Sequence, residues 1–386
     1  MANSWVEVTI EEIKDSSPYS LSMGPFGSNI KTDNFVLEGV PIIRGVNLKE
    51  ERFHDDNFVF LTETKADELK SANAFPGDIV FTHRGTLGQV GFIPNNSKFK
   101  RYVISQSQMK LRVNPFKADP LYVFYFFRSP QGQQALLANT STTGVPAISS
   151  PLSTLRSLKL PLPPLHIQQK ISGILDSIDR KIELNQRINQ TLEGIAHALF
   201  KYMFIENPDR IGWEKTTLSS FAYITSGKRP EDRKNVQNKE YSIPLYGGGG
   251  IMGYTNKPLL NEPILLTGRV GTLGLVFRIS TPCWASDNTL VLRPKKTEDY
   301  EFLYFQLLHT DILNLNRGST QPLLTQTDLQ KTIVKNPSKG LISIFHHNVS
   351  SIFDLLESNN KESKNLQLLR DILLPRLMRG ENLIND

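Results

Sequence analysis

The sequence has 386 residues, 39% of them hydrophobic and 21% charged, which is typical of a soluble globular protein and excludes a disordered chain. No stretch approaches the roughly 18 apolar residues that cross a bilayer, and the single cysteine, Cys283, excludes a disulfide framework, so we expect a cytoplasmic protein of two globular units. The net charge of +6 favours a polyanionic partner, although charge alone leaves nucleic-acid binding and an unrelated role equally open.

The first globular region is predicted to span residues 1–162. It mixes β-rich runs such as Ile79–Thr82 with an aromatic segment, Tyr122–Phe127, that fits either a strand or a short helix. A long helix is predicted over residues 163–206, where side chains follow the alternating steps of three and four that are typical of a coiled-coil seam. The predicted seam consists of Ile171, Ile174, Ile178, Lys181, Asn185, Ile188, Leu192, Ile195, Leu199 and Tyr202.

A second globular region is predicted over residues 207–337, followed by a second long helix over residues 338–386. Its predicted seam consists of Phe345, Asn348, Ile352, Leu355, Asn359, Glu362, Leu366, Leu369, Leu373 and Arg376. Pro375 should disturb the last turn of this helix. The matched Asn185 and Asn359 are expected to face one another and fix the register of the two helices, unless both point to solvent.

The chain contains an internal repeat. Four segments of the first half return in the same order in the second half: Trp5 as Trp213, Ile79–Gly88 as Ile264–Gly274 with Val270 inserted, Leu111-Arg112 as Leu292-Arg293, and Tyr125-Phe126 as Tyr304-Phe305. The separation falls from 208 residues at Trp5 to 174 at Leu155 and Leu329, and then stays constant through the predicted helices. The second half is therefore a shortened copy of the first.

Several segments resemble the specificity subunits of type I restriction-modification systems. Leu160–Ile171 resembles the entry into the first spacer helix of that family, and Leu369–Leu377 resembles the close of its second. Gly24–Ser28 and Tyr246–Tyr254 resemble recurrent loops of its target-recognition domains. His166 departs from the pattern, because an acidic residue is expected there, and the second helix entry at Ser338–Gly340 is degenerate.

The resemblance implies an α+β fold with two mixed α/β target-recognition domains, separated by two long antiparallel helices that form a coiled coil. It implies that each domain reads one half of a bipartite site on double-stranded DNA. It also implies that the helices dock two methyltransferase subunits, through which restriction subunits join. A duplicated unit with antiparallel helices has a pseudo-twofold axis, and this symmetry matches a bipartite duplex site. We expect the helices to set the spacing between the half-sites.

No catalytic constellation is predicted, and no cofactor is expected. Gly248–Gly253 fits G-x-G-x-x-G, but Asn256-Lys257-Pro258 follows instead of a helix, so we interpret it as a flexible turn. Asp209 with Asp232 resembles a loose nuclease pattern. His346 and His347 are adjacent and point apart on a helix, which favours surface or docking roles over metal ligation.

The candidate DNA contacts are polar and basic residues in predicted loops. Arg84 and Arg269 are predicted to occupy matching places beside matching glycines, where arginine grips phosphate or reads guanine. A salt bridge within each domain explains them equally well. The further phosphate or base candidates are Ser28, Lys31, Arg44, Asn47, His83, Lys228, Arg229, Arg233, Lys234 and Gln321. A merely solvated face is the competing interpretation for each of these residues.

The leading hypothesis is a non-enzymatic DNA-reading scaffold that directs partner methyltransferase and restriction subunits. The main alternative is a self-sufficient nuclease or methyltransferase with duplicated recognition domains. A coiled-coil adaptor without DNA binding is the third possibility, and its affinity for DNA would show no salt dependence.

Overall fold

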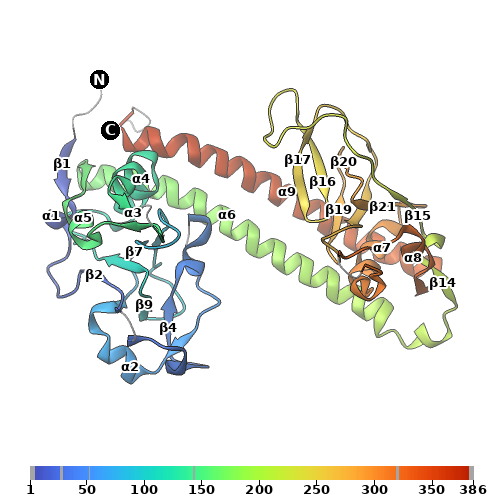
Figure 1. The fold of residues 1–386 in the computed structure, drawn as a ribbon, viewed down its shortest axis with the longest axis horizontal. Coiled ribbons are helices and arrows are strands. Elements are labelled where there is room, and N and C mark those ends of the chain that lie inside the picture. The colour runs from blue at the N-terminus through green and yellow to red at the C-terminus, as the bar shows by residue number, and fades with distance from the viewer. Residues whose placement is uncertain (1–4, 27–28, 52, 142–143, 319–320, 382–386) are drawn as a thin grey trace. The chain divides into compact units, whose positions relative to one another are not determined.

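The computed structural model describes residues 5–26, 29–51, 53–141, 144–318 and 321–381 (Figure 1). Two compact units are present, residues 1–184 with 362–386, and residues 185–361. The boundary between them passes through both long helices, α6 (Leu165–Phe200) and α9 (Lys339–Met378). The chain therefore follows the predicted order of globular part, long helix, globular part, long helix, and each helix contributes to both units. None of the described helices has the length and apolarity needed to span a bilayer.

The first unit is built around a four-stranded sheet in the order β2-β10-β7-β8, with strands Leu21–Met23, Gln108–Leu111, Ile79–Thr82 and Val90–Phe92. A second sheet has the order β3-β5-β4-β9-β6, with strands Phe35–Val36, Phe60–Leu61, Val40–Ile43, Tyr102–Ile104 and Asn73–Ala74. Two strand pairs complete it, β1 (Val6–Thr9) with β13 (Lys159–Leu162) and β11 (Thr140–Ser141) with β12 (Ala147–Ile148). Its short helices are α1 (Ile10–Ile13), α2 (Glu63–Glu68), α3 (Pro120–Arg128), α4 (Pro130–Leu137) and α5 (Pro151–Ser157).

The second unit has the same plan with fewer residues. Its four-stranded sheet has the order β15-β21-β18-β19, with strands Ala222–Ser226, Thr289–Pro294, Ile264–Gly268 and Val276–Ile279. A three-stranded sheet has the order β17-β16-β20, with strands Gly250–Thr255, Ile243–Gly247 and Trp284–Ala285. The remaining elements are the pair β14 (Lys215–Thr217) with β22 (Ile333–Lys335), and the helices α7 (Asp299–Leu308) and α8 (Gln326–Lys331).

The shared topology confirms the internal repeat. In each unit the first strand pairs antiparallel with the strand that comes just before the long helix. β1 pairs with β13, which precedes α6, and β14 pairs with β22, which precedes α9. Each unit also has one parallel pair, β4 with β9 and β16 with β20, next to its four-stranded sheet. The two globular parts are therefore mixed α/β domains of one ancestral plan.

Strand register corrects the predicted alignment of the two copies. Val80 lies opposite Lys110 and Gly91, while Leu266 lies opposite Val291 and Phe277. Lys110 and Val291 are equivalent positions, because their separation of 181 residues is the same as that of Leu111 and Leu292. Their strand partners Val80 and Leu266 are therefore equivalent too, at a separation of 186. The predicted separation of 185 with Val270 inserted is wrong.

Side-chain alternation explains why the register cannot slip by one residue. Ile79 and Leu265 both pack in the core that includes residues of the long helices, whereas Val80 and Leu266 both pack in a second, separate core. A shift of one residue would exchange these two faces. As a consequence Arg269 matches His83, and Arg84 matches Val270.

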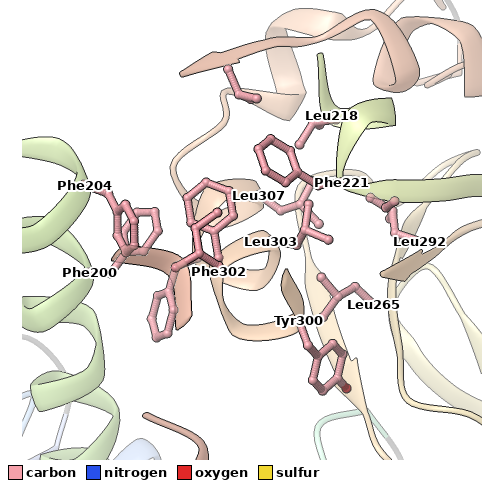
Figure 2. Packing of buried hydrophobic residues seen from close by; sticks show 14 of the residues in the cluster. Phe200, Phe204, Leu218, Phe221, Leu265, Leu292, Tyr300, Phe302, Leu303 and Leu307 are labelled. Carbon is pink, nitrogen blue, oxygen red and sulfur yellow. The ribbon is translucent and has the colours of Figure 1, made fainter. Parts of the chain in front are cut away.

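The aromatic segment Tyr122–Phe127 is helical and forms most of α3. Asp119 caps this helix by accepting from the Leu121 N–H, and Pro120 occupies the first turn, where its missing N–H costs nothing. Its counterpart α7 lies in the core of the second unit. There the rings of Phe200, at the end of α6, and Phe204, in the π-helical turn Lys201–Ile205 that follows, approach Phe302 (Figure 2). The Phe204 and Phe302 centroids are 5.0 Å apart in an edge arrangement, which is favourable for aromatic rings.

The buried face of the long helices differs from the predicted seam. On α6 the buried positions are Gln168, Ile171, Ser172, Leu175, Ile178, Asp179, Ile182, Asn185, Asn189, Ala196 and Phe200. Predicted seam residues such as Ile174, Ile195 and Tyr202 are exposed, as are Leu355 and Leu369 on α9. The helices pack against the globular domains as well as against each other, so the buried face is turned by about one residue from a two-helix seam. In addition, α9 continues past Pro375 to Met378.

The two helices run antiparallel within each unit. In the first unit, Lys181 on α6 pairs with Glu362 on α9 at 3.0 Å, and Asp179 pairs with Arg370 at 3.0 Å, so later residues of one helix meet earlier residues of the other. In the second unit, the Asn185 amide donates to the main-chain oxygen of Asn359 at 3.5 Å. The Asn359 amide donates to the side chain of Asn189 at 2.8 Å.

A buried carboxylate joins the first domain to the helices. Asp179 accepts from Arg128 at 2.8 Å and from the Tyr125 hydroxyl at 3.0 Å, both on α3, and from Arg370 on α9. Burial and the neighbouring Asp179 charge raise the pKa of Tyr125, so its hydroxyl stays protonated and able to donate. In the second unit a different carboxylate has this role, because Glu301 on α7 pairs with Arg278 at 3.3 Å and with His346 on α9 at 2.6 Å.

We predict that Asp179→Ala destabilises the first unit by roughly 3–5 kcal/mol, because the buried Arg128 and the partly buried Arg370 lose their shared partner. Asp371→Ala is the matched control, since Asp371 pairs with the same Arg370 but is largely exposed, and little change is expected. Urea unfolding, with hydrogen exchange of the α3 amides to locate the transition, measures both variants. An equal loss of unfolding free energy in the two variants would show that the buried contact of Asp179 contributes no more to stability than the exposed contact of Asp371.

Candidate nucleic-acid interface

Strand ends in the second domain bring several turns to one edge of its sheet. Ser226 at the end of β15 lies opposite Leu290, and Gly268 at the end of β18 lies opposite Thr289. The turns after β15 and β18 and before β21 therefore meet. We name the second loop edge as residues 227–229, 247–250, 269–274, 286–288 and 321–324.

Glycines make the close packing of this edge possible. A Cβ on Gly268 would overlap the main-chain oxygen of Thr272, and one on Gly248 would lie 3.0 Å from the Gly268 Cα. Gly271 has a φ of +80°, a conformation that favours glycine. The glycine-rich segment predicted to be a flexible turn is the hairpin between β16 and β17, and Gly248 in it is buried. Strand β17 begins at Gly250, directly after this turn.

The first domain has an equivalent edge. We name the first loop edge as residues 24–26, 44–47, 83–88, 105–107 and 145–148. The Ser105 N–H donates to Ile43 at 2.9 Å, just as the Ser286 N–H donates to Tyr246 at 2.9 Å. A cavity of about 140 Å³ opens here, lined by Pro25, Ile30, Phe35, Ile42, Arg44, Ser105 and Gln106.

Three predicted cations lie at or beside the first loop edge. Arg44 donates to the main-chain oxygen of Asn57 at 3.1 Å and lines the cavity. Lys31 is exposed and follows Ile30, another cavity residue, while Arg84 is exposed at the end of β7. Within the described part of the chain, none of the three forms a salt bridge. Ser28 lies outside the described residues.

Two predicted base-reading residues of this domain serve its own structure instead. Asn47 is buried; its side-chain oxygen accepts from the Arg44 N–H at 3.0 Å, and its amide donates to Asp56 at 2.7 Å. His83 is 6% exposed, and its Nε2 lies 3.1 Å from the Gln106 oxygen. Burial lowers the pKa of His83, so the ring is neutral near pH 7. Both side chains therefore make hydrogen bonds within the domain, and their contact with DNA stays a prediction.

The second loop edge collects four of the predicted residues. Lys228 and Arg229 are exposed and directly follow β15. Arg269 is half-buried after β18, and Gln321 is exposed with its amide 3.7 Å from the position of a Cβ on Gly271. Arg269 has no salt bridge among the described residues, so the competing interpretation of an internal ion pair finds no partner there.

Arg233 and Lys234 lie elsewhere in the second domain. The main chain of Lys234 pairs with Tyr254, four residues along β17 from the Gly250 turn, which corresponds to about 13 Å of strand. The Lys234 ammonium lies 5.3 Å from the Tyr241 ring centroid, and Arg233 is exposed. These residues form a separate basic segment beside β17.

Catalytic alternatives receive no support from the geometry. Among the described residues, no group of three or more His, Cys, Asp or Glu side chains is placed to hold a metal ion. Asp232 accepts from the Tyr241 hydroxyl, whereas Asp209 lies in a separate 3-10 turn, Pro208–Gly212. His346 was predicted to be a surface or docking residue, but it is paired with the buried Glu301.

Sequence reasoning missed Ser105-Gln106 and its counterpart Ser286-Asp287. Ser105 and Gln106 line the first cavity, and the Asp287 position matches Gln106 at the same 181-residue separation. Both dipeptides precede a central strand of the four-stranded sheet. The shared serine at a constant separation was the available signal.

The family model of the type I restriction modification DNA specificity domain matches residues 5–194 and 210–366. The chain belongs to this family. A type I restriction enzyme HindI specificity subunit from Haemophilus influenzae is 26% identical over 400 residues, covering 79% of this chain and 86% of that protein. The type I restriction enzyme MjaIX specificity subunit of Methanocaldococcus jannaschii is 24% identical over 373 residues, covering 83% of this chain and 81% of that protein.

A solved structure shares the fold of this specificity-family chain. The type I restriction-modification S subunit from M. genitalium superposes with a TM-score of 0.65 at 19% identity, covering 97% of this chain and 96% of that one. The resemblance stated from the sequence is thus confirmed at the level of the family and of the fold.

We predict that Gly268→Ala disrupts the second loop edge, because its Cβ would overlap the rigid main chain of Thr272. Overpacking of this kind costs roughly 1–3 kcal/mol or more. Gly249→Ala is the matched control, since its Cβ would lie 3.9 Å from Thr272 Oγ1 and meet nothing closer. Thermal unfolding and amide exchange over residues 268–274 measure the difference. A harmless Gly268→Ala would refute the packing described here.

Proposed function

We propose that this chain is the sequence-reading subunit of a type I restriction-modification complex, and that each domain reads one half of a bipartite site on double-stranded DNA. The observation that carries the proposal is the pair of loop edges. They share one main-chain scaffold, but they present different side chains. The positions of Arg44 and Arg84 in the first domain are occupied by Gly247 and Val270 in the second. Two copies of one reader with different contact residues fit two different half-sites.

The charges at these edges support contact with DNA. Lys31, Arg44 and Arg84 at the first edge, and Lys228 and Arg229 at the second, are available to phosphates because no described carboxylate pairs with them. Lysine and arginine in such positions supply the salt-dependent part of the affinity. Base contacts by arginine and amide side chains then supply the discrimination between sequences.

We further propose that the chain acts in the cytoplasm, carries no catalytic group and binds no cofactor, and that methyl transfer and cleavage belong to partner subunits. Exposed apolar residues on the long helices offer docking positions for two methyltransferase subunits, through which restriction subunits join. These residues are Ile174, Leu184, Leu368, Leu369 and Ile372 in the first unit, and Ile195, Tyr202, Ile344 and Leu355 in the second. Leu368 and Ile372 lie one turn apart on α9, and neighbouring exposed apolar groups mark protein interfaces where they form a continuous patch.

The proposal is tested by assaying the purified chain alone and with its partner subunits. Alone it should bind DNA but show neither methyl transfer from S-adenosylmethionine nor Mg²⁺-dependent cleavage, and both activities should need the partners. Either activity in the isolated chain would favour the self-sufficient enzyme. In the same assay, K228A/R229A should lower the slope of log affinity against log salt by up to about 2, because each lost phosphate contact removes roughly 0.9.

We also propose that the two long helices set the distance between the half-sites. The helical segments α6 and α9 contain 36 and 40 residues. If they set the spacing, one added heptad in both should lengthen the unread spacer by about three base pairs, since seven residues add about 10 Å and a base pair about 3.4 Å. Both half-sites should remain unchanged, although the rotation of one half-site lowers activity. Methylation mapping decides this, and an unchanged spacer in an active complex would rule out a ruler.

A further inference from the structure

One position has the same main-chain environment in both domains but a different side chain. The N–H of His83 donates to Ser107 at 2.9 Å, and that of Arg269 donates to Asn288 at 2.8 Å. The carbonyl of His83 accepts from Ile148 at 2.9 Å, and that of Arg269 accepts from Leu324 at 2.8 Å. Two main-chain hydrogen bonds in each domain therefore fix the same backbone geometry. At this position the two domains differ only in the side chain.

The two side chains differ in what satisfies them. His83 is neutral and buried against the Gln106 oxygen. Arg269 is half-buried, its Nε is shielded from solvent without a hydrogen-bond partner, and no described carboxylate pairs with it. A partly dehydrated guanidinium without a counter-charge is costly, and the cost is offset when acceptors bind to it.

The backbone that carries Arg269 is closely packed. Gly268 precedes Arg269, and Gly248 and the main chain of Thr272 pack against Gly268 so tightly that a Cβ would not fit there. The Gln321 amide lies near Gly271, two residues after Arg269, and adds a second polar group. An arginine that a rigid backbone holds in a fixed place suits a base edge, whereas exposed side chains such as Lys228 suit phosphates.

We propose that Arg269 reads a guanine in the half-site of the second domain, by donating to its O6 and N7 in the major groove. This inference rests on the proposed function. Guanine is the base that offers two adjacent acceptors to a guanidinium fork. The first domain has the buried His83 at this place, and histidine lacks the guanidinium fork, so the bidentate contact is particular to the second domain.

Methylation mapping of complexes assembled on the full chain tests the assignment. R269A and R269K should each relax one G·C position in one half-site by about 5- to 100-fold and leave the other half-site unchanged, since lysine keeps the charge but loses the fork. R269H installs the residue that the first domain accommodates, and should relax the same position. R293A is the control, because Arg293 pairs with Glu262 at 2.8 Å and lies on β21 away from the loop edge.

A binding cycle on the mapped site separates base reading from phosphate contact. Replacing the guanine by 7-deazaguanine removes the N7 acceptor, and should weaken binding by the wild-type chain but not further weaken binding by R269A. A uniform loss of affinity over all sequences, with a smaller salt slope, would make Arg269 a phosphate contact and overturn the proposal. So would an unchanged site in every Arg269 variant.

Failure of the underlying function gives a different result. In that case the wild-type complex yields no recurrent bipartite motif at all, before any variant is compared. Thermal unfolding of R269A and R269H alongside R293A identifies a folding defect, and the R269K data then decide, because lysine preserves the length and charge of the side chain.

Discussion

The alternation of side chains along the central strands is the constraint on which both domains depend. On β7 and β18, one set of residues packs toward the long helices and the other set packs into a separate core beside the second sheet. Each domain thus has two cores that share one sheet. The first core attaches the domain to α6 and α9 and also contains loop-edge residues, Leu87 and Ile148 in the first domain and Leu273 and Leu324 in the second. The second core joins the four-stranded sheet to the neighbouring sheet. A slip of one residue would disrupt both cores together.

Electrostatic contacts complete the attachment in a way that differs between the copies. In the first unit the buried carboxylate lies on a long helix, at Asp179, and the cations come from the domain and from α9. In the second unit the buried carboxylate lies on the domain, at Glu301, and a partner from α9 is His346. The apolar contacts are common to the repeat, while the ionic contacts are particular to each copy. The repeat therefore conserves a packing plan without conserving each polar partner.

Much of the architecture was predictable because it depends on patterns that survive divergence. The duplicated order of segments and the helical periodicity indicated the repeat, the two long helices and the family. The alignment failed locally at Arg84 and Arg269. The identities of Ile79, Thr82 and Arg84 with residues 185 positions later suggested an insertion before Gly-Thr-Leu-Gly, and strand pairing excludes that insertion. The predicted seam was wrong at Ile174 and Ile195, which are exposed. Periodicity alone does not reveal that the globular domain also packs on the helices and so shifts the face that is buried.

The candidate site was less predictable than the fold, and the reasons are physical. Lys228, Arg229, Arg269 and Gln321 converge because antiparallel strands end at one edge, a result of topology that no local pattern encodes. Asn47 and His83 are polar residues in loops, yet each one satisfies neighbouring main-chain groups. Only pairing partners and burial separate a residue that holds a turn from one that is free to meet a ligand.

The exposure of side chains at the loop edges has an evolutionary consequence. Arg84, Lys228 and Arg229 are exposed, and none of them is part of the cores that attach the domains to α6 and α9. Substitutions at such positions therefore leave that attachment intact. A lineage can then drift from one DNA target to another through intermediates that still fold, with divergence concentrated in a small number of turns.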